Sequence, residues 1–211
     1  MTALDREVEA ELRRVLAARR PGDAVQGEEL GSSGGRSGRR WVLDPVDGTA
    51  QFVRGIPVWG TQVALVEDGR AVAAIVSAPA MGRRWWGRVG EGAWSDRGEL
   101  RVSAVDEVAS AGLSFGRLAE LHDPSRVIAL GAACDAAGGY ESFWGPMLVA
   151  EGVLDIAVLA DPEPWDLVPA QVLVEAAGGA CTALDLGSRL GRPTAVLTNG
   201  LLHEAALSAL A

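Results

Sequence analysis

The chain has 211 residues and a formal net charge of −9, with 19 basic residues against 28 acidic ones. Hydrophobic residues make up 48% of it and charged residues 22%, which are ordinary values for a globular protein and exclude a disordered chain. The negative charge argues against nucleic acid and anionic membranes as partners. Every basic residue is Arg, which excludes chemistry that depends on a catalytic or phosphate-binding Lys.

The first predicted element is a helix that begins after Thr2 and ends at Pro21-Gly22. Apolar residues recur along it with the helical period, and Thr2 with Asp5 three positions later is typical of a capping box. The charged residues between the apolar ones, Glu9 included, are expected to form a solvent-exposed face.

Residues 31–38 (GSSGGRSG) are predicted to form a loop from their composition. They contain the G-x-S-x-G pattern of a hydrolase nucleophile around Ser33, with His122 or His203 as the base. Such a nucleophile requires a strand before it and a helix after it. The Gly-rich and Arg-rich flanks favour a plain loop instead.

Strands are predicted between residues 41 and 94. Residues 41–43 form a short apolar strand that ends at Asp44, and residues 61–67 and 70–76 are joined by Asp68-Gly69, a typical hairpin turn. Residues 85–87 and 92–94 suggest two further strands. Five of the seven Trp lie in this half, and we expect them to pack a sheet.

The second half mixes helices and strands. Helices are predicted at residues 144–151, 166–177 and 201–210, the second with Pro169 in its first turn, and strands at 154–159 and 194–197; residues 103–140 show no clear pattern. Because these elements do not alternate regularly, the predicted class is α+β in layers. We expect a single domain over residues 1–211 with two lobes, at about 1–102 and 103–211.

The chemistry is expected at residues 44–49 (DPVDGT), at the end of a buried strand. Asp44 and Asp47 cannot both stay ionised there without compensation, and a hard divalent cation such as Mg²⁺ would supply it. The N–H groups of Gly48 and Thr49 are available to hold a phosphate. A turn stabilised by Asp side chains is the alternative explanation of this motif.

Two other acidic positions suit the same site. Glu28-Glu29 precedes the Gly-rich loop, and Asp166 stands at the start of a predicted helix. Taken singly, the first is also explained by a solvated loop and the second by a helix N-cap.

Four motifs, in this order, resemble those of the inositol monophosphatase family. They are GEE at residues 27–29, WVLDPVDGT at 41–49, FVRGIP at 52–57, and Trp165-Asp166 before a helix that ends in AAGG. The chain is most similar to the histidinol-phosphate phosphatases of actinobacterial type, on residues 52–59, 76–86, 147–156 and 198–203. The resemblance implies a layered αβαβα sandwich of the sugar-phosphatase type and a metal-dependent, lithium-sensitive phosphomonoesterase.

The resemblance also implies a set of metal ligands. Glu28, Asp44 and the Val46 carbonyl would hold one Mg²⁺, and Asp44, Asp47 and Asp166 a second. A third, loosely held ion would lie beside Glu28.

Further roles follow from the same match. The backbone N–H groups of Gly48 and Thr49 would bind the phosphate. Thr49, with Asp5 as its partner, would position the attacking water, so that Thr49, Asp5 and Glu28 are the catalytic candidates. The remaining candidates for binding the substrate are Asp166, Ser142 and Glu163.

The chain departs from the family where the leaving group would bind. Leu159 stands where the related phosphatases have a Glu that contacts the substrate, and Gly138 and Ser142 stand where the histidinol-phosphate group tends to have Arg and Asp. We expect the chemistry to be kept and the choice of substrate to differ, with Glu163 or Asp161 in place of the missing Glu. The sequence also starts at the family's VTxxD segment, without the leading helix and basic loop, which predicts a more open and slower metal centre.

The predicted function is Mg²⁺-dependent hydrolysis of a small polar phosphomonoester that resembles histidinol phosphate or inositol phosphate. A sugar or nucleoside phosphate is an alternative substrate, and a non-catalytic protein that binds a phosphorylated ligand is an alternative function. Two widely separated Cys and the lack of a long apolar run predict a cytoplasmic protein. The resemblance implies a homodimer.

Overall fold

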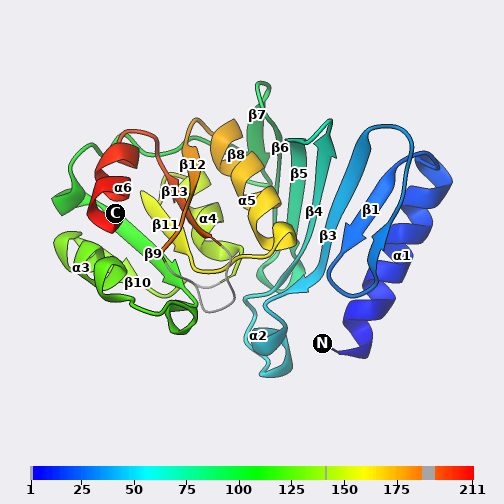
Figure 1. Ribbon diagram of the computed structural model, residues 1–211, viewed down its shortest axis with the longest axis horizontal. Helices are drawn as coiled ribbons and strands as arrows, with labels where there is room; N and C mark the ends of the chain where they lie inside the picture. Colours follow the sequence, from blue (N-terminus) through cyan, green and yellow to red (C-terminus); the bar gives the residue numbers. More distant parts are fainter. Residues whose placement is uncertain (1, 141, 187–192) are drawn as a thin grey trace.

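The computed structural model describes residues 2–140, 142–186 and 193–211. Its elements form five layers, in which two sheets enclose a pair of helices and further helices cover the outer face of each sheet (Figure 1). This arrangement confirms the layered αβαβα sandwich and the α+β class predicted from the sequence.

The first sheet has eight strands, all from the first half of the chain. In spatial order they are β2 (Gly31–Ser33), β1 (Ala24–Gly27), β3 (Arg39–Asp47), β4 (Gly60–Glu67), β5 (Arg70–Ala78), β6 (Arg83–Arg88), β7 (Gly92–Ser95) and β8 (Gly98–Glu99). Neighbours pair antiparallel except β1 and β3, which are parallel. Asp68 and Gly69 both have positive φ, which is the conformation of a type I′ turn, so the predicted hairpin is confirmed.

The second sheet has five strands. In spatial order they are β10 (Ala136–Gly138), β9 (Gly112–Gly116), β11 (Ile156–Leu159), β13 (Thr194–Thr198) and β12 (Ala180–Leu184). The central strands β9 and β11 are parallel, with Gly116 opposite Leu159. Their carboxyl ends therefore lie side by side and open onto the same edge of the sheet.

The helices complete the layers. Outermost on the first sheet is α1 (Ala3–Arg19), and α4 (Trp144–Ala150) and α5 (Pro164–Ala176) lie between the sheets. The outer face of the second sheet carries α3 (Ser125–Ala133) and α6 (His203–Leu210). Short elements connect these, namely α2 (Thr49–Val53), η1 (Pro79–Met81), η2 (Val108–Ser110) and η3 (Leu118–Glu120).

Two hydrophobic cores hold the layers together. The larger one joins the first sheet, α4, α5 and the inner face of the second sheet, and it contains the fully buried Trp85, Met147 and Leu173. The smaller one lies between the second sheet and its outer helices. Since α5 packs on both sheets, the larger core fixes how the two sheets lie relative to each other.

The start of α5 differs from the prediction. The helix begins at Pro164, and Glu163 is its N-cap, so Asp166 is the third helical residue and Pro169 lies inside the helix, after the first turn. Asp166 and Glu163 form a capping box in which the Glu163 N–H donates to Asp166 Oδ2 over 3.0 Å. The side chain of Asp166 is therefore fixed at a helix start. None of the described helices has the length and apolar character needed to cross a membrane.

Candidate functional site

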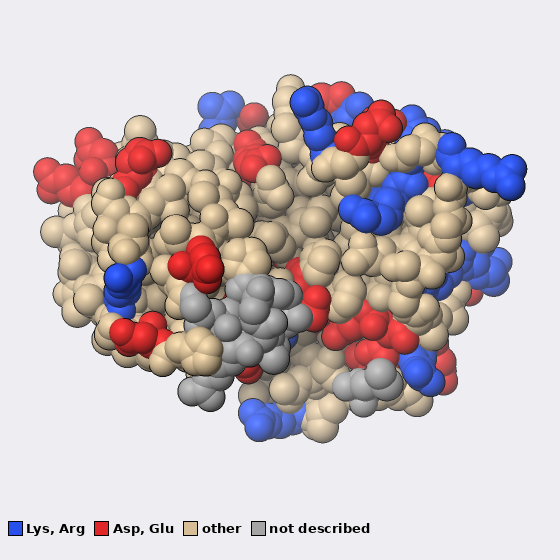
Figure 2. Space-filling view, viewed as in Figure 1, with Lys and Arg blue, Asp and Glu red and all other residues tan. Residues whose placement is uncertain are grey.

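A cavity of about 230 Å³ opens where the end of β3 faces the carboxyl ends of β9 and β11. Acidic side chains are visible in the hollow near the middle of the face in Figure 2. The described residues that line the cavity are Glu28, Asp44, Val46, Asp47, Gly48, Thr49, Ala50, Gln51, Gly116, Arg117, Ser142, Leu159, Ala160, Pro162 and Asp166. The cavity thus combines a strongly acidic side with a second side that is largely apolar.

Three carboxylates converge in this cavity from both halves of the chain. Asp44 and Asp47 stand at the end of β3 and Asp166 at the start of α5, and one oxygen of each lies within 4.8 Å of the others. The pairing of β3 with β4 shifts register between Asp44 and Asp47. This irregularity is where the DPVD segment brings both carboxylates to the same side, so the motif lies inside a strand and does not form the turn considered as its alternative explanation.

The pKa values of these groups show that the negative charge of the cluster is only partly compensated, although Arg117 lowers the pKa of Asp47 to some extent. Burial raises the pKa of Asp47 to about 7, with repulsion from Asp166 adding to it. Burial, then repulsion from Asp47 and Glu28, raises the pKa of Asp44 well above its ordinary value. Burial and repulsion from Asp166 raise the pKa of Glu28 to about 7. Asp44 Oδ1 is also buried and forms no hydrogen bond with the described residues.

These observations fit a small divalent cation. Mg²⁺ prefers a few carboxylate and carbonyl oxygens, with water or phosphate completing its ligands. The raised pKa values of Asp44 and Asp47 and the unpaired Asp44 oxygen are what such oxygens show when no cation compensates them.

Glu28 is held at the site by Glu9, which the sequence analysis placed on the solvent-exposed face of the first helix. Glu9 is fully buried, because its carboxylate accepts hydrogen bonds from the backbone N–H groups of Glu29 (2.7 Å) and Leu30 (3.3 Å). The prediction that Glu9 faces solvent is therefore wrong. Gly27 is required at the same place, since a Cβ there would overlap the Glu9 carboxylate. Together Glu9 and Gly27 fix the loop that presents Glu28.

The structure brings Asp5 and Thr49 together, as the resemblance implied. The Thr49 hydroxyl lies 3.2 Å from Asp5 Oδ1 and 2.9 Å from the Val46 carbonyl oxygen. Burial works against ionisation of Asp5, but hydrogen bonds from Thr2 outweigh it and hold the pKa of Asp5 below its ordinary value. Gly48 has a φ of 82°, and a Cβ there would lie 2.8 Å from the Val58 carbonyl oxygen. The turn into α2 therefore needs glycine.

The second oxygen of Asp47 is fixed by two donors from different elements. The Gln62 side chain on β4 donates to Asp47 Oδ2 over 2.8 Å, and the backbone N–H of Phe143, at the start of α4, donates over 2.7 Å. Both donors are buried with Asp47. Sequence reasoning missed Gln62 and Phe143, because neither lies near Asp47 in the chain and no local pattern marks them.

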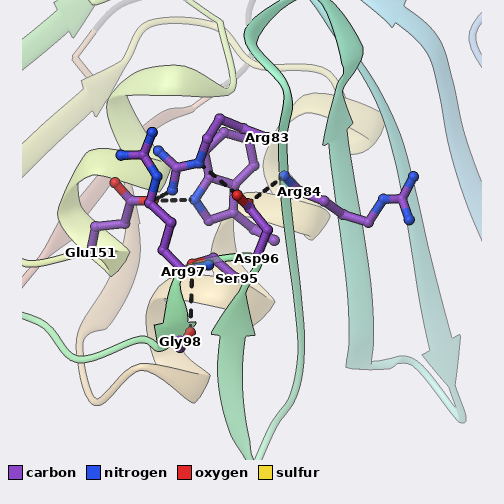
Figure 3. Close-up of polar contacts among 8 residues, drawn as sticks. Arg83, Arg84, Ser95, Asp96, Arg97, Gly98 and Glu151 are labelled. Carbon is purple, nitrogen blue, oxygen red and sulfur yellow. Dashed lines mark hydrogen bonds and ion pairs between the residues drawn. The ribbon is translucent and has the colours of Figure 1, made fainter.

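The far end of α4 is anchored as firmly as its start. Glu151, which follows α4, accepts a hydrogen bond from Trp85 Nε1 over 2.5 Å and forms an ion pair with the buried Arg83 (Figure 3). The Trp85 ring in turn packs on Phe143, with 5.9 Å between ring centroids. Glu151 and Trp85 therefore help to hold the N–H group that fixes Asp47.

The residues predicted to bind the leaving group are only partly brought together. Ser142 and Leu159 line the cavity, whereas Glu163 is not among the described lining residues and instead caps α5. Asp161 is buried at the turn before α5. Arg117, which sequence reasoning missed, lines the cavity and lies 3.7 Å from Asp166, measured from Nη1 to Oδ2.

A conformational signal marks the same region. Four described residues other than glycine have positive φ, and three of them, Arg117, Ser142 and Asp161, lie in or beside the cavity. Residues with side chains adopt this conformation rarely, and it is commonest at functional sites. The sequence does not reveal these positive φ angles, because none of the three residues is glycine, the residue that adopts them most readily.

The serine-hydrolase alternative finds no support in the geometry. Ser33 lies on β2, and its hydroxyl donates to the Val25 carbonyl oxygen of the neighbouring strand over 3.4 Å. His203 belongs to the second sheet's outer layer, where Thr182 and Thr198 hydrogen-bond to its two ring nitrogens. Each group is therefore used in local structure.

Comparison with known proteins agrees with the geometry. Residues 1–211 match the inositol monophosphatase family. A histidinol-phosphatase of Mycobacterium tuberculosis is 43% identical over 218 residues, covering 100% of this chain and 84% of the relative. A histidinol-phosphatase of Streptomyces coelicolor is 37% identical, covering 98% of this chain and 82% of the relative. The solved structure of an inositol monophosphatase from Anabaena has a TM-score of 0.90 at 25% identity, covering 100% of this chain and 86% of that one.

Proposed function

Because the chain belongs to the inositol monophosphatase family and is a phosphoric monoester hydrolase, we propose that it uses Mg²⁺ to hydrolyse small polar phosphomonoesters. Histidinol phosphate is the first candidate substrate, since two of the relatives are named for it. Inositol phosphate, or the phosphate of another sugar or a nucleoside, is the next. A cavity of about 230 Å³ suits a small molecule of this kind.

One observation carries the proposal. Asp44, Asp47 and Asp166 come from two halves of the chain, yet their oxygens lie within 4.8 Å of one another in a cavity. Three carboxylates gathered in this way repel each other, and a protein retains such a cluster when a cation occupies it in the working state.

The proposed ligands are those the family resemblance implied. Glu28, Asp44 and the Val46 carbonyl would hold one cation, Asp44, Asp47 and Asp166 a second, and Glu28 a third, weakly bound one. A bound divalent cation supplies charge neutralisation at the phosphate and lowers the pKa of water. The protein's remaining task is to position the water and the ester.

Asp5 and Thr49 are proposed to position the attacking water. When the Thr49 hydroxyl donates to Asp5, its oxygen is free to accept a hydrogen bond from water. The lowered pKa of Asp5 keeps it ionised and makes it a weak base at neutral pH. Asp5 therefore acts by fixing the direction of the Thr49 hydroxyl, and not by taking a proton.

The phosphate and the leaving group are proposed to bind on opposite sides of the carboxylates. The N–H groups of Gly48 and Thr49 at the start of α2 have no partner within that helix, so they are available to phosphate oxygens. Ser142 and Asp166, which also line the cavity, are the proposed contacts of the leaving group.

A phosphate-release screen tests the proposal. Histidinol, inositol, sugar and nucleoside monophosphates are offered with Mg²⁺, and we expect turnover that EDTA abolishes, Li⁺ inhibits and Asp47→Asn removes. Asp68→Asn, on an exposed hairpin turn, is the matched control and should retain wild-type turnover. Hydrolysis that EDTA leaves unchanged would overturn the proposed mechanism.

Leu159 motivates a second candidate, a protein that binds a phosphorylated ligand without turnover. Its side chain lines the cavity and cannot pair with an ammonium group or bind a hydroxyl. Calorimetry that detects Mg²⁺ and ligand binding, with no phosphate released from the whole panel, would favour this candidate.

The family resemblance also supports a cytoplasmic homodimer. Sedimentation or light scattering at several protein concentrations would measure the oligomeric state. A mass of one chain, 21.9 kDa, at micromolar concentration would refute the dimer.

A further inference from the structure

Arg117 is the single basic residue among the described residues that line the cavity. It follows directly after β9, at the point where the ends of β9 and β11 lie side by side. Arg117 therefore reaches the cavity from the second sheet, and its guanidinium lies beside Asp166. The sequence analysis gave Arg117 no role, and it is not one of the proposed cation or phosphate ligands.

The backbone holds Arg117 in a conformation that does not favour it. Its φ is 54°, in the left-handed region where a side chain is disfavoured and glycine is not. The Arg117 carbonyl accepts a hydrogen bond from the Glu120 N–H over 2.8 Å, which fixes the turn into η3. An arginine at a position suited to glycine indicates that its side chain has a functional role at this site.

The guanidinium is only loosely engaged. Its ion pair with Asp166 spans 3.7 Å, which is longer than a charge-assisted hydrogen bond, and its side chain is 56% exposed. Within the described residues its side chain forms no hydrogen bond. In the proposed function Asp166 also binds a cation, which would compete with Arg117 for this carboxylate. Arg117 would then need another anionic partner.

The surroundings of Arg117 restrict what that partner is. Leu159, Ala160 and Pro162 form the neighbouring wall and offer no side-chain charge. An ammonium group placed there would meet the guanidinium at close range and be repelled, whereas a carboxylate or a second phosphate would be attracted.

We propose that Arg117 makes this enzyme select phosphomonoesters whose alcohol carries a second anionic group close to the ester, and disfavour those whose alcohol carries an ammonium group. This inference rests on the proposed function and narrows its substrate class. Among the candidate substrates of the proposed function it disfavours histidinol phosphate, whose alcohol carries an amino group, and favours those with a second anionic group.

Three two-carbon esters of similar size test the inference with Mg²⁺ saturating. They are phosphoglycolate, which has a carboxylate, 2-hydroxyethyl phosphate, which is neutral beyond the ester, and phosphoethanolamine, which has an ammonium group. We expect kcat/KM for phosphoglycolate to exceed that for 2-hydroxyethyl phosphate by about tenfold, and phosphoethanolamine to be the poorest substrate. Added NaCl should shrink the preference, since the guanidinium is more than half exposed.

Two variants and a matched control assign the preference to Arg117. Arg117→Gln should reduce the ratio between phosphoglycolate and 2-hydroxyethyl phosphate to within about twofold, and Arg117→Lys should keep part of it. Arg88→Gln is the control, because Arg88 is 57% exposed and paired with Glu91 on the first sheet, away from the cavity. It should leave the ratio unchanged.

The outcomes separate the two proposals. A wild-type enzyme that hydrolyses all three esters equally, or prefers phosphoethanolamine, overturns the inference and leaves the phosphatase intact. An Arg117→Gln enzyme that keeps the full preference overturns the assignment to Arg117. Should Arg117→Gln fail to fold, the wild-type ratios and their salt dependence still decide. Failure to hydrolyse these three esters and every ester of the histidinol, inositol, sugar and nucleoside panel overturns the proposed function itself.

Discussion

Asp47→Asn is expected to change stability and activity in opposite directions. Asn has the shape of Asp and lacks its charge. Its amide oxygen can take the place of Asp47 Oδ2 and accept from Gln62 and Phe143, as the carboxylate does. Its amide N–H₂ group then points toward the other carboxylates of the cluster and can donate to them. The substitution therefore removes a repulsive charge and keeps the packing.

The size of the effect follows from the pKa of Asp47. Burial and the neighbouring Asp166 raise that pKa to about 7 from an ordinary value of 3.8. Between these pH values the folded state binds more protons than the unfolded state, so stability falls as pH rises. Above pH 7 the cost for an isolated group is about 4 kcal/mol. Because the carboxylates share this repulsion, we expect Asn to recover about half, or about 2 kcal/mol.

Thermal unfolding of EDTA-treated protein at pH 8 measures this directly. For a chain of this size, about 2 kcal/mol corresponds to a Tm about 4–8 °C higher for Asp47→Asn than for the wild type. The difference should shrink toward pH 4 and vanish below about pH 3, where the carboxyl is protonated in both states. With Mg²⁺ the order reverses, because the wild type gains cation-dependent stability that the variant lacks. A variant less stable than the wild type at pH 8 without metal would refute this reasoning.

Three further outcomes are expected. The Tm of EDTA-treated wild type should fall as pH rises from about 4 to 7, as the raised pKa of Asp47 requires, and Mg²⁺ should restore it at pH 8; a rise without metal would contradict the assignment. Glu9→Gln removes the charge of the buried carboxylate that accepts the Glu29 N–H next to Glu28. Denaturant unfolding should show that the free energy of unfolding falls by about 1–3 kcal/mol, and calorimetry should show a weaker affinity for Mg²⁺. Glu11→Gln, on the exposed face of α1, should change neither quantity. Glu151→Gln leaves the buried Arg83 with Asp96 as its one remaining ion-pair partner among the described residues and should cost about 1–3 kcal/mol by the same assay; a change below about 0.5 kcal/mol, as for a surface pair, would show that α4 is not anchored there.

Local patterns in the sequence were sufficient for much of the fold. The Asp68-Gly69 turn between two alternating strands and the helix predicted at residues 144–151 depend on chemistry within a few residues, and the structure has both, the helix over Trp144–Ala150. Residues 103–140 could not be predicted, because their elements are short and depend on distant partners. The three-residue β10, for example, exists only through its pairing with β9.

The residues of the candidate site likewise fall into those that local sequence motifs indicate and those that depend on distant contacts. Asp44, Asp47 and Asp166 could be proposed from the sequence because each lies near the end of a predicted strand or the start of a predicted helix, in motifs that resemble those of the family. Glu9 could not, since its position among charged residues of α1 is typical of a solvated face. Glu9 is buried because the loop that carries Glu28 supplies N–H donors to its carboxylate, and the sequence does not show this contact.

The acid cluster can persist only because apolar packing opposes its repulsion. Asp44 and Asp47 belong to the first sheet, and Asp166 belongs to α5, which packs against both sheets through Val172 and Leu173. Repulsion among the three carboxylates acts to separate α5 from β3, whereas burial of the α5 side chains holds them together. The interface between α5 and the first sheet thus supplies the free energy that keeps the ligands converged, while a bound cation removes the force that opposes it.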